Sequence, residues 1–127
     1  MSNDLNVLVG KKILAVNLSP DMYYIQFKTE GKDFDFECHG DCCAHAYIAT
    51  IQNVECLIGQ EVTAVLAEES SHEDYTFQFV DNVFYSINTS KGSCHMDFRV
   101  EHNGYYGGDL ILRDSLAVKW IPAKDTQ

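Results

Sequence analysis

The sequence has few basic residues and no long apolar run. Its 127 residues include 9 Lys and Arg against 19 Asp and Glu, a formal net charge of −10. A protein that coats nucleic acid needs a basic surface to neutralise phosphates, so direct nucleic-acid binding is not expected. No stretch of 18 apolar residues is present, so we expect no membrane-spanning helix. The first residues also lack the basic and apolar segments of a signal peptide, so we expect a cytoplasmic protein.

The motifs of common catalytic sites are also missing. The sequence contains no glycine-rich phosphate loop, no HExxH motif and no GxSxG motif. Five cysteines and five histidines allow many combinations of a catalytic thiol with a histidine base. The sequence does not show which of them, if any, the fold brings into contact. We therefore predict a protein that is not an enzyme, with no catalytic residues and no cofactor.

Five cysteines are many for this length, and their odd number argues against a disulfide framework. The densest group contains Cys38, Cys42 and Cys43, with His39 and His45 beside them. Zinc prefers four tetrahedral Cys or His ligands, but the adjacent Cys42 and Cys43 have no second pair at a zinc-like spacing. We favour buried thiols that act as small hydrophobes and predict no metal site. A zinc ligand and a reactive thiol at a helix start stay open as alternatives.

Alternating apolar residues predict antiparallel strands over much of the chain. The first three, at about residues 9–18, 23–28 and 33–38, form a meander with turns at 19–21 and 29–32. Further strands are expected at 62–66, 75–80, 83–88, 94–101, 110–113 and 116–120, with an acidic loop at 68–74 and a hairpin turn at 89–92.

Residues 42–58 are predicted to be helical, because their apolar residues recur at spacings of three and four. Asp41 can cap the start of this helix, Asn53 can divide it, and Gly59 can end it. We therefore predict a single α+β domain over residues 1–127, with an ordered core at about 8–121. In this fold an antiparallel meander carries one or two helices, at about residues 42–58, packed on the sheet. The apolar residues of the helical pattern are Tyr47, Ile48, Ile51, Val54 and Ile58.

The segment Asn-Gly-Tyr-Tyr-Gly-Gly at residues 103–108 is the main candidate for a binding site. Its glycines permit a close approach of a ligand, and its two tyrosines offer flat faces and hydroxyl groups. The only two arginines of the chain flank it, and a guanidinium beside aromatic rings suits a phosphate-and-base ligand. The alternative is a glycine-rich bulge whose tyrosines cover the core while the arginines pair with acids. The predicted ligand-binding residues are Lys91, Arg99, Asn103, Tyr105, Tyr106 and Arg113.

Four stretches, in this order and spacing, resemble a family of small phage and prophage proteins known mostly as a domain of unknown function. They are residues 8–13, 40–48, 57–59, and 89–92 leading to 103–108, and the resemblance covers about residues 8–113. The Asp-Cys-Cys and Asn-Gly-Tyr-Tyr-Gly-Gly elements are its most specific parts. The chain also resembles the Thoeris anti-defence proteins of phages, which bind a cyclic ADP-ribose signal and keep it from the host's effector.

The resemblance implies a non-catalytic phage protein of the host cytoplasm that sequesters a nucleotide-type immune signal, a cyclic ADP-ribose isomer. Its partners would be this small signalling molecule and a second copy of the chain, in a homodimer or higher homo-oligomer. One alternative is an acidic inhibitor of a host defence or CRISPR protein that mimics nucleic acid through Asp33, Asp35, Glu37 and residues 68–74. Another is a zinc- or thiol-dependent domain centred on Cys42 and Cys43.

Overall fold

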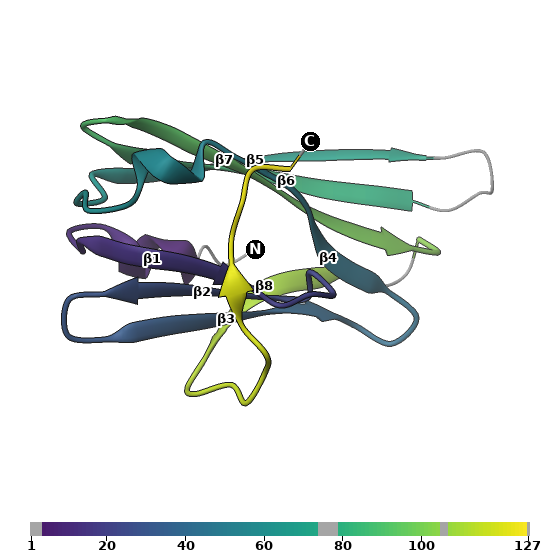
Figure 1. Ribbon diagram of the computed structural model, residues 1–127. Helices are drawn as coiled ribbons and strands as arrows, with labels where there is room; N and C mark the ends of the chain where they lie inside the picture. The colour runs from purple at the N-terminus through teal and green to yellow at the C-terminus, as the bar shows by residue number, and fades with distance from the viewer. Residues whose placement is uncertain (1–3, 74–78, 105–106, 127) are drawn as a thin grey trace.

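Two antiparallel β-sheets pack face to face in the computed structural model, which describes residues 4–73, 79–104 and 107–126 (Figure 1). One sheet has five strands in the order β8-β3-β2-β1-β9, and the other has four in the order β4-β7-β6-β5. The elements are η1 (Asp4–Leu8), β1 (Ile13–Leu18), β2 (Tyr24–Thr29), β3 (Asp33–Gly40), β4 (His45–Gln52), η2 (Val54–Cys56), β5 (Ala64–Glu73), β6 (Phe79–Thr89), β7 (Gly92–His102), β8 (Gly108–Arg113) and β9 (Ile121–Pro122).

The predicted α+β fold is wrong, because residues 42–58 form strand β4 and the single turn η2 and contain no α-helix. The register of β4 against β7 shifts between Ile48 and Thr50, which marks a β-bulge. A bulge inserts one extra residue into the alternation of a strand. The inward apolar residues of β4 are therefore not all two apart, and their spacing imitates the period of a helix. Gly59 does adopt a left-handed φ of 76°, but it follows η2.

The predicted meander of three strands is confirmed by β1, β2 and β3, which pair in antiparallel register. The hairpin turn at 89–92 is also confirmed, between β6 and β7. The predicted acidic loop at 68–74 is wrong for residues 68–73, which continue β5. No strand forms at 116–120, where the chain runs to the short β9. The strand predicted at 75–80 lies partly outside the described residues, and β6 begins at Phe79.

The inner faces of the two sheets share one hydrophobic core. Phe27 and Phe36 from the five-stranded sheet and Phe98 from β7 of the other sheet are completely buried. The rings of Phe27 and Phe36 meet edge to face with centroids 5.9 Å apart. Leu5 and Leu8 of η1 are also completely buried in this core. Every second residue of a core strand therefore points into the interior, and the residues between them point outward.

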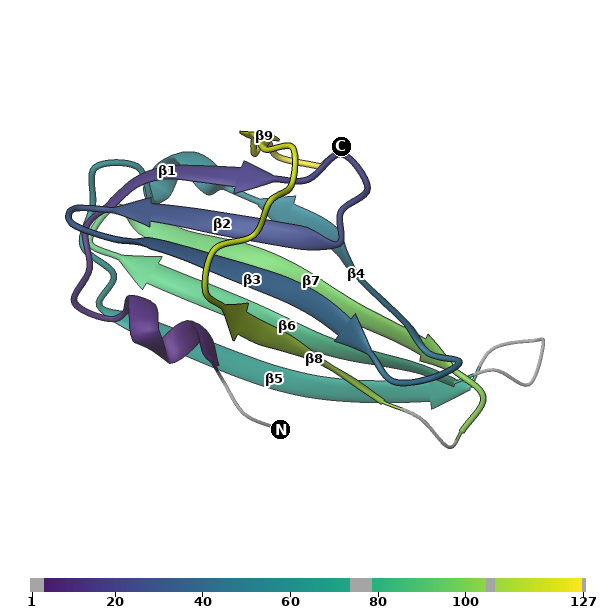
Figure 2. The same cartoon turned by 90° about the horizontal axis from the view of Figure 1, so that it is seen from below.

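The outer faces of the two sheets differ, because the segment that leads to β9 crosses only the five-stranded sheet (Figure 2). The backbone N–H of Leu116 in this segment donates to Asp35 Oδ2 over 3.0 Å. Asp35 also accepts from Gln26 Nε2 over 3.0 Å, and both side chains are buried although they face away from the core. No described segment crosses the outer face of the four-stranded sheet.

Among the described residues, no helix is long and apolar enough to span a membrane.

Truncation of Phe36 to alanine tests the shared core. Phe36 is completely buried, so Phe36→Ala removes apolar contacts and leaves a cavity between the sheets. We expect a loss of about 3–5 kcal/mol in the free energy of unfolding, measured by urea denaturation. The matched control Phe84→Ala removes a ring that is 45% exposed and should change stability by less than about 1 kcal/mol. Equal losses in the two variants would contradict this core.

Candidate functional site

The outer face of the four-stranded sheet carries four rows of side chains, each row crossing all four strands. The register of the strand pairs places these outward residues opposite one another. We call this surface the open face. From the end nearest η2 to the end at which β4 begins, its rows are Leu66–Ser86–His95–Gln52, Glu68–Phe84–Asp97–Thr50, Ser70–Asn82–Arg99–Tyr47 and His72–Val80–Glu101–His45.

A polar chain of contacts holds Arg99 near the middle of the open face. Asn82 Nδ2 donates to Asp97 Oδ1 over 2.7 Å, and Arg99 Nη2 donates to Asp97 Oδ2 over 3.0 Å. Burial alone would lower the pKa of the Arg99 guanidinium, but the nearby Asp97 carboxylate and the Tyr47 hydroxyl raise it. Arg99 Nε is buried without a hydrogen-bond partner, and the side chain is 37% exposed. Arg99 is thus a positioned cation with unused hydrogen-bonding capacity.

Aromatic side chains continue this network toward the end of the sheet. The rings of His45 and Tyr47 stack with centroids 4.7 Å apart, and Tyr23 meets His45 edge to face at 5.4 Å. The Tyr23 hydroxyl and His45 Nε2 share a hydrogen bond of 2.9 Å. Tyr47 donates to Glu101 Oε2 over 3.1 Å, and burial together with this bond raises the pKa of Tyr47. These contacts fix the aromatic and charged groups at this end of the open face in place.

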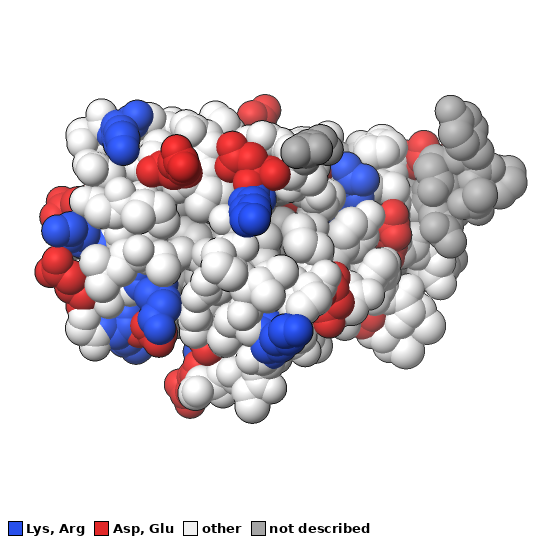
Figure 3. Space-filling view, in the orientation of Figure 1, with Lys and Arg blue, Asp and Glu red and all other residues white. Residues whose placement is uncertain are grey.

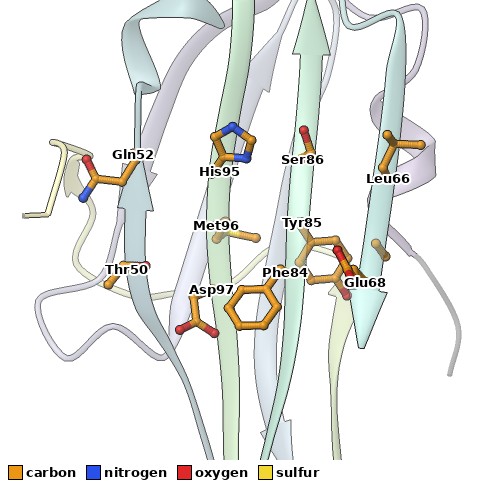
Figure 4. A pocket seen from close by; sticks show the side chains of 11 residues that line it. Thr50, Gln52, Leu66, Glu68, Phe84, Tyr85, Ser86, His95, Met96 and Asp97 are labelled. Carbon is orange, nitrogen blue, oxygen red and sulfur yellow. The ribbon is translucent and has the colours of Figure 1, made fainter. Parts of the chain in front are cut away.

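The other half of the open face is more apolar. Phe84 is 45% exposed and Leu66 is 60% exposed. The register places Phe84 between Glu68 on β5 and Asp97 on β7, as the close view shows (Figure 4). These residues line a broad depression of about 590 Å³ together with Gln52 and others. This half of the face therefore presents an exposed aromatic ring between two carboxylates.

The two most specific sequence motifs meet at the end of the sandwich beside the last row. The Asp41 N–H donates to the Gly107 carbonyl over 2.8 Å, and the Gly107 N–H donates to Asp41 Oδ2 over 3.3 Å. His102 orders the same connection, because its Nδ1 accepts from the Gly104 N–H over 2.9 Å. Its Nε2 then donates to Asp81 Oδ2 over 2.7 Å. Gly104 has φ 101°, and a Cβ there would lie 2.8 Å from the Phe79 ring, so only glycine fits.

The structure separates most of the predicted ligand-binding residues. Arg99 lies on the open face, whereas Arg113 lies on the outer face of the opposite sheet, where its Nε donates to Glu37 Oε1 over 2.9 Å. Lys91 precedes β7 and Asn103 follows it, so they lie twelve residues apart along an extended strand, or about 40 Å at about 3.3 Å per residue. Tyr105 and Tyr106 lie outside the described residues. Arg99 and Arg113 therefore do not converge on one phosphate group within a single copy.

The carboxylates of the predicted acidic surface on β3 are buried or form ion pairs with other residues of the chain. Asp35 is buried under the segment leading to β9, Glu37 binds Arg113, and the Asp33 carboxylate lies 4.0 Å from Lys28 Nζ. In contrast, the acids of β5 at positions 68, 69 and 73 are exposed. Positive and negative side chains are interspersed on the face shown in Figure 3, which carries no continuous patch of either sign. The exposed acids of β5 therefore remain the available part of this surface.

The cysteines divide into two groups. Cys38, Cys56 and Cys94 are buried. Cys42 and Cys43 are exposed in the loop between β3 and β4, not at the start of a helix, so the prediction of buried thiols is wrong for these two. Among the described residues, no group of three or more His, Cys, Asp or Glu side chains could hold a metal ion within one copy.

The pattern of residues in the sequence does not reveal most of the open face. The helical pattern predicts Tyr47 on the buried stripe of a helix, includes His45 only as a neighbour of the cysteines, and assigns no role to Phe84. The β-branched residues of segment 45–52 are a signal that favoured a strand. If this segment is a strand, His45 and Tyr47 lie on the face opposite Ala46 and Ile48, and the structure places them there.

These features define a β-sandwich with one covered and one open outer face. Residues 6–112 match the model of DUF7448, a domain of unknown function, so the chain belongs to this family. The match confirms the predicted membership of a family of small domains of unknown function. No curated protein and no solved structure matches the chain.

We expect the protein to lose stability at high pH, because two cysteine thiols and one tyrosine hydroxyl are buried in their protonated form. Burial is the main cause that raises the pKa of Cys94 and of Tyr85 to about 12, and it also raises the pKa of Cys38. Above about pH 9 the unfolded chain releases protons that the folded chain keeps, so a rise in pH favours unfolding. The stabilisation is complete below pH 9 and is lost as the pH rises toward 12. Urea unfolding between pH 7.5 and 11 should show this decline, and Cys94→Ala should make it shallower; constant stability would contradict it.

Proposed function

We propose that this chain is a non-catalytic binding protein whose open face engages a protein partner. The observation that carries the proposal is the contrast between the two outer faces. The five-stranded sheet is crossed by the chain's own segment, whereas Phe84, Leu66 and Tyr47 face outward from the four-stranded sheet and no segment among residues 4–73, 79–104 and 107–126 covers them. Aromatic residues and arginine supply most of the binding energy in protein interfaces, and this face presents both.

The shape of the open face favours a macromolecule over a small ligand. Small-molecule sites are concave and enclose most of their ligand. The depression around Phe84 lies on the exposed surface of a sheet, and its neighbours Leu66 and Glu68 are themselves exposed. A broad, shallow surface of this kind provides area for a partner rather than enclosure for a metabolite.

The charge of the open face favours a partner with basic groups. Its four rows contain the three carboxylates of Glu68, Asp97 and Glu101 against the single guanidinium of Arg99. The exposed Glu69 and Glu73 alternate to the other side of β5, so they add negative charge beside this face and not on it. A net charge of −10 also attracts a basic partner from a distance. This agrees with the role of an acidic phage inhibitor of a host defence or CRISPR protein, as the resemblance to phage proteins suggests.

A plating assay with surface variants tests this function. The chain is expressed in hosts that each carry one defence system, and the plating efficiency of a sensitive phage is measured. Where the wild type restores plating, we expect the purified defence protein to bind it, and Phe84→Ala to weaken that binding by about 30-fold or more. The matched control Leu14→Ala removes an apolar side chain that is 47% exposed on β1 of the opposite sheet and should bind normally. Full binding by Phe84→Ala would overturn the proposed surface.

A second candidate is the sequestration of a cyclic ADP-ribose isomer, supported by the stacked rings of His45 and Tyr47 beside Arg99. Stacked rings and a guanidinium can hold a base and a phosphate. One copy offers one guanidinium there, between the Asp97 and Glu101 carboxylates. A second cation and an enclosing wall would have to come from another copy, in agreement with the predicted homo-oligomer.

Thermal unfolding in the presence of cyclic ADP-ribose isomers tests this second candidate. A ligand at 100 times its Kd adds about 2.7 kcal/mol to the stability of a protein that binds it only when folded. We expect a rise in Tm that Arg99→Ala abolishes and that the control Arg113→Ala on the opposite face preserves. Unchanged unfolding curves with every isomer would exclude the nucleotide and leave the protein partner.

A further inference from the structure

Cys42 and Cys43 are adjacent, exposed thiols in the loop between β3 and β4, and the proposed function does not use them. Free cysteine is among the most buried residue types in proteins. The other three cysteines of the chain follow that tendency, but these two do not. Their exposure therefore differs from the behaviour of a small hydrophobe.

The backbone turns both thiols to the same side. Successive side chains of an extended strand point in opposite directions, which would separate adjacent thiols. Cys43 instead has φ 69°, a left-handed conformation that residues other than glycine and asparagine seldom adopt. As a result, the Sγ atoms of Cys42 and Cys43 lie 3.5 Å apart. The Ala44 N–H donates to the Asp41 carbonyl over 2.8 Å and closes this turn.

The distance between the two sulfurs suits a shared tetrahedral zinc ion. Zn–S bonds of about 2.3 Å at the tetrahedral angle place two thiolates about 3.8 Å apart, close to the observed separation. Zinc in a structural site takes four such ligands. The described residues of one copy offer no third ligand beside the pair. One copy therefore supplies half of a zinc site.

We propose that two copies of the chain share one zinc ion, each providing Cys42 and Cys43 as ligands. In this reaction four thiols bind one Zn²⁺, four Zn–S bonds form and four protons are released to solvent. The pair lies in the loop between β3 and β4 at one end of the sandwich (Figure 2). The proposal does not depend on the partner of the open face.

Two copies of the chain repel one another, so this contact depends on the Zn–S bonds. Each copy carries a net charge of −10, and a zinc ion bound by four thiolates adds a further charge of −2 to the pair of copies. Salt screens repulsion between whole copies more than it weakens bonds between zinc and sulfur. We therefore expect added salt to strengthen the zinc-linked dimer.

Titration of the full-length, reduced protein with Co²⁺, followed by Zn²⁺, tests the shared site. We expect sulfur-to-cobalt charge-transfer and tetrahedral d–d absorption bands that saturate at one metal ion per two chains and disappear when zinc displaces cobalt. Sedimentation measured in parallel should show the mass doubling with metal and returning to that of the metal-free protein with chelator.

Cys42→Ser and Cys43→Ser should each abolish the bands and the metal-dependent dimer, while the unfolding midpoint without metal stays unchanged because both side chains are exposed. The matched control Cys94→Ala removes a buried thiol and should keep one metal ion per two chains. Saturation at one ion per chain without a change in mass, metal binding by the double serine variant, or no binding by the wild type would each overturn the proposal.

Discussion

The packing of two sheets around one core determines the surfaces of this protein. Ile48, Val83 and Phe98 point into the core from three strands of the four-stranded sheet. Their neighbours Tyr47 and Arg99 must then point outward, because successive side chains of a strand alternate between its faces. A shift of one residue in any strand would bury polar groups and expose core residues. The order of side chains on the open face is thus maintained by the same free energy that holds the core together.

The C-terminal segment makes the two outer faces unequal. It crosses the five-stranded sheet, where Asp35 accepts from its backbone, and then joins β1 as the short β9. Beyond β9, Asp125 accepts from the Val54 N–H, and the Thr126 N–H donates to the Ile51 carbonyl, so the tail also ties the two sheets together. The chain therefore covers one outer face with its own residues, and no described segment covers the other.

The end of the sandwich brings together segments that are distant in the sequence. The loop at Asp41 bonds to Gly107, and His102 links Asp81 to the backbone of Gly104. These contacts hold the loop between β3 and β4 and the connection between β7 and β8 at the same end of the sandwich.

The sequence by itself determined the strands whose apolar residues alternate without interruption, such as β1 to β3, and the turn between β6 and β7. Its prediction of buried thiols in the group at 38–45 is confirmed for Cys38 and is wrong for Cys42 and Cys43. The bulge at Ile48 imitated a helical period, so the pattern alone misplaced β4. Only the tertiary structure decided that Arg99 and Arg113 lie on opposite outer faces and that Cys42 and Cys43 stay exposed. Those outcomes depend on which sheet each strand joins, and pairing between distant strands leaves no mark in the local pattern of residues.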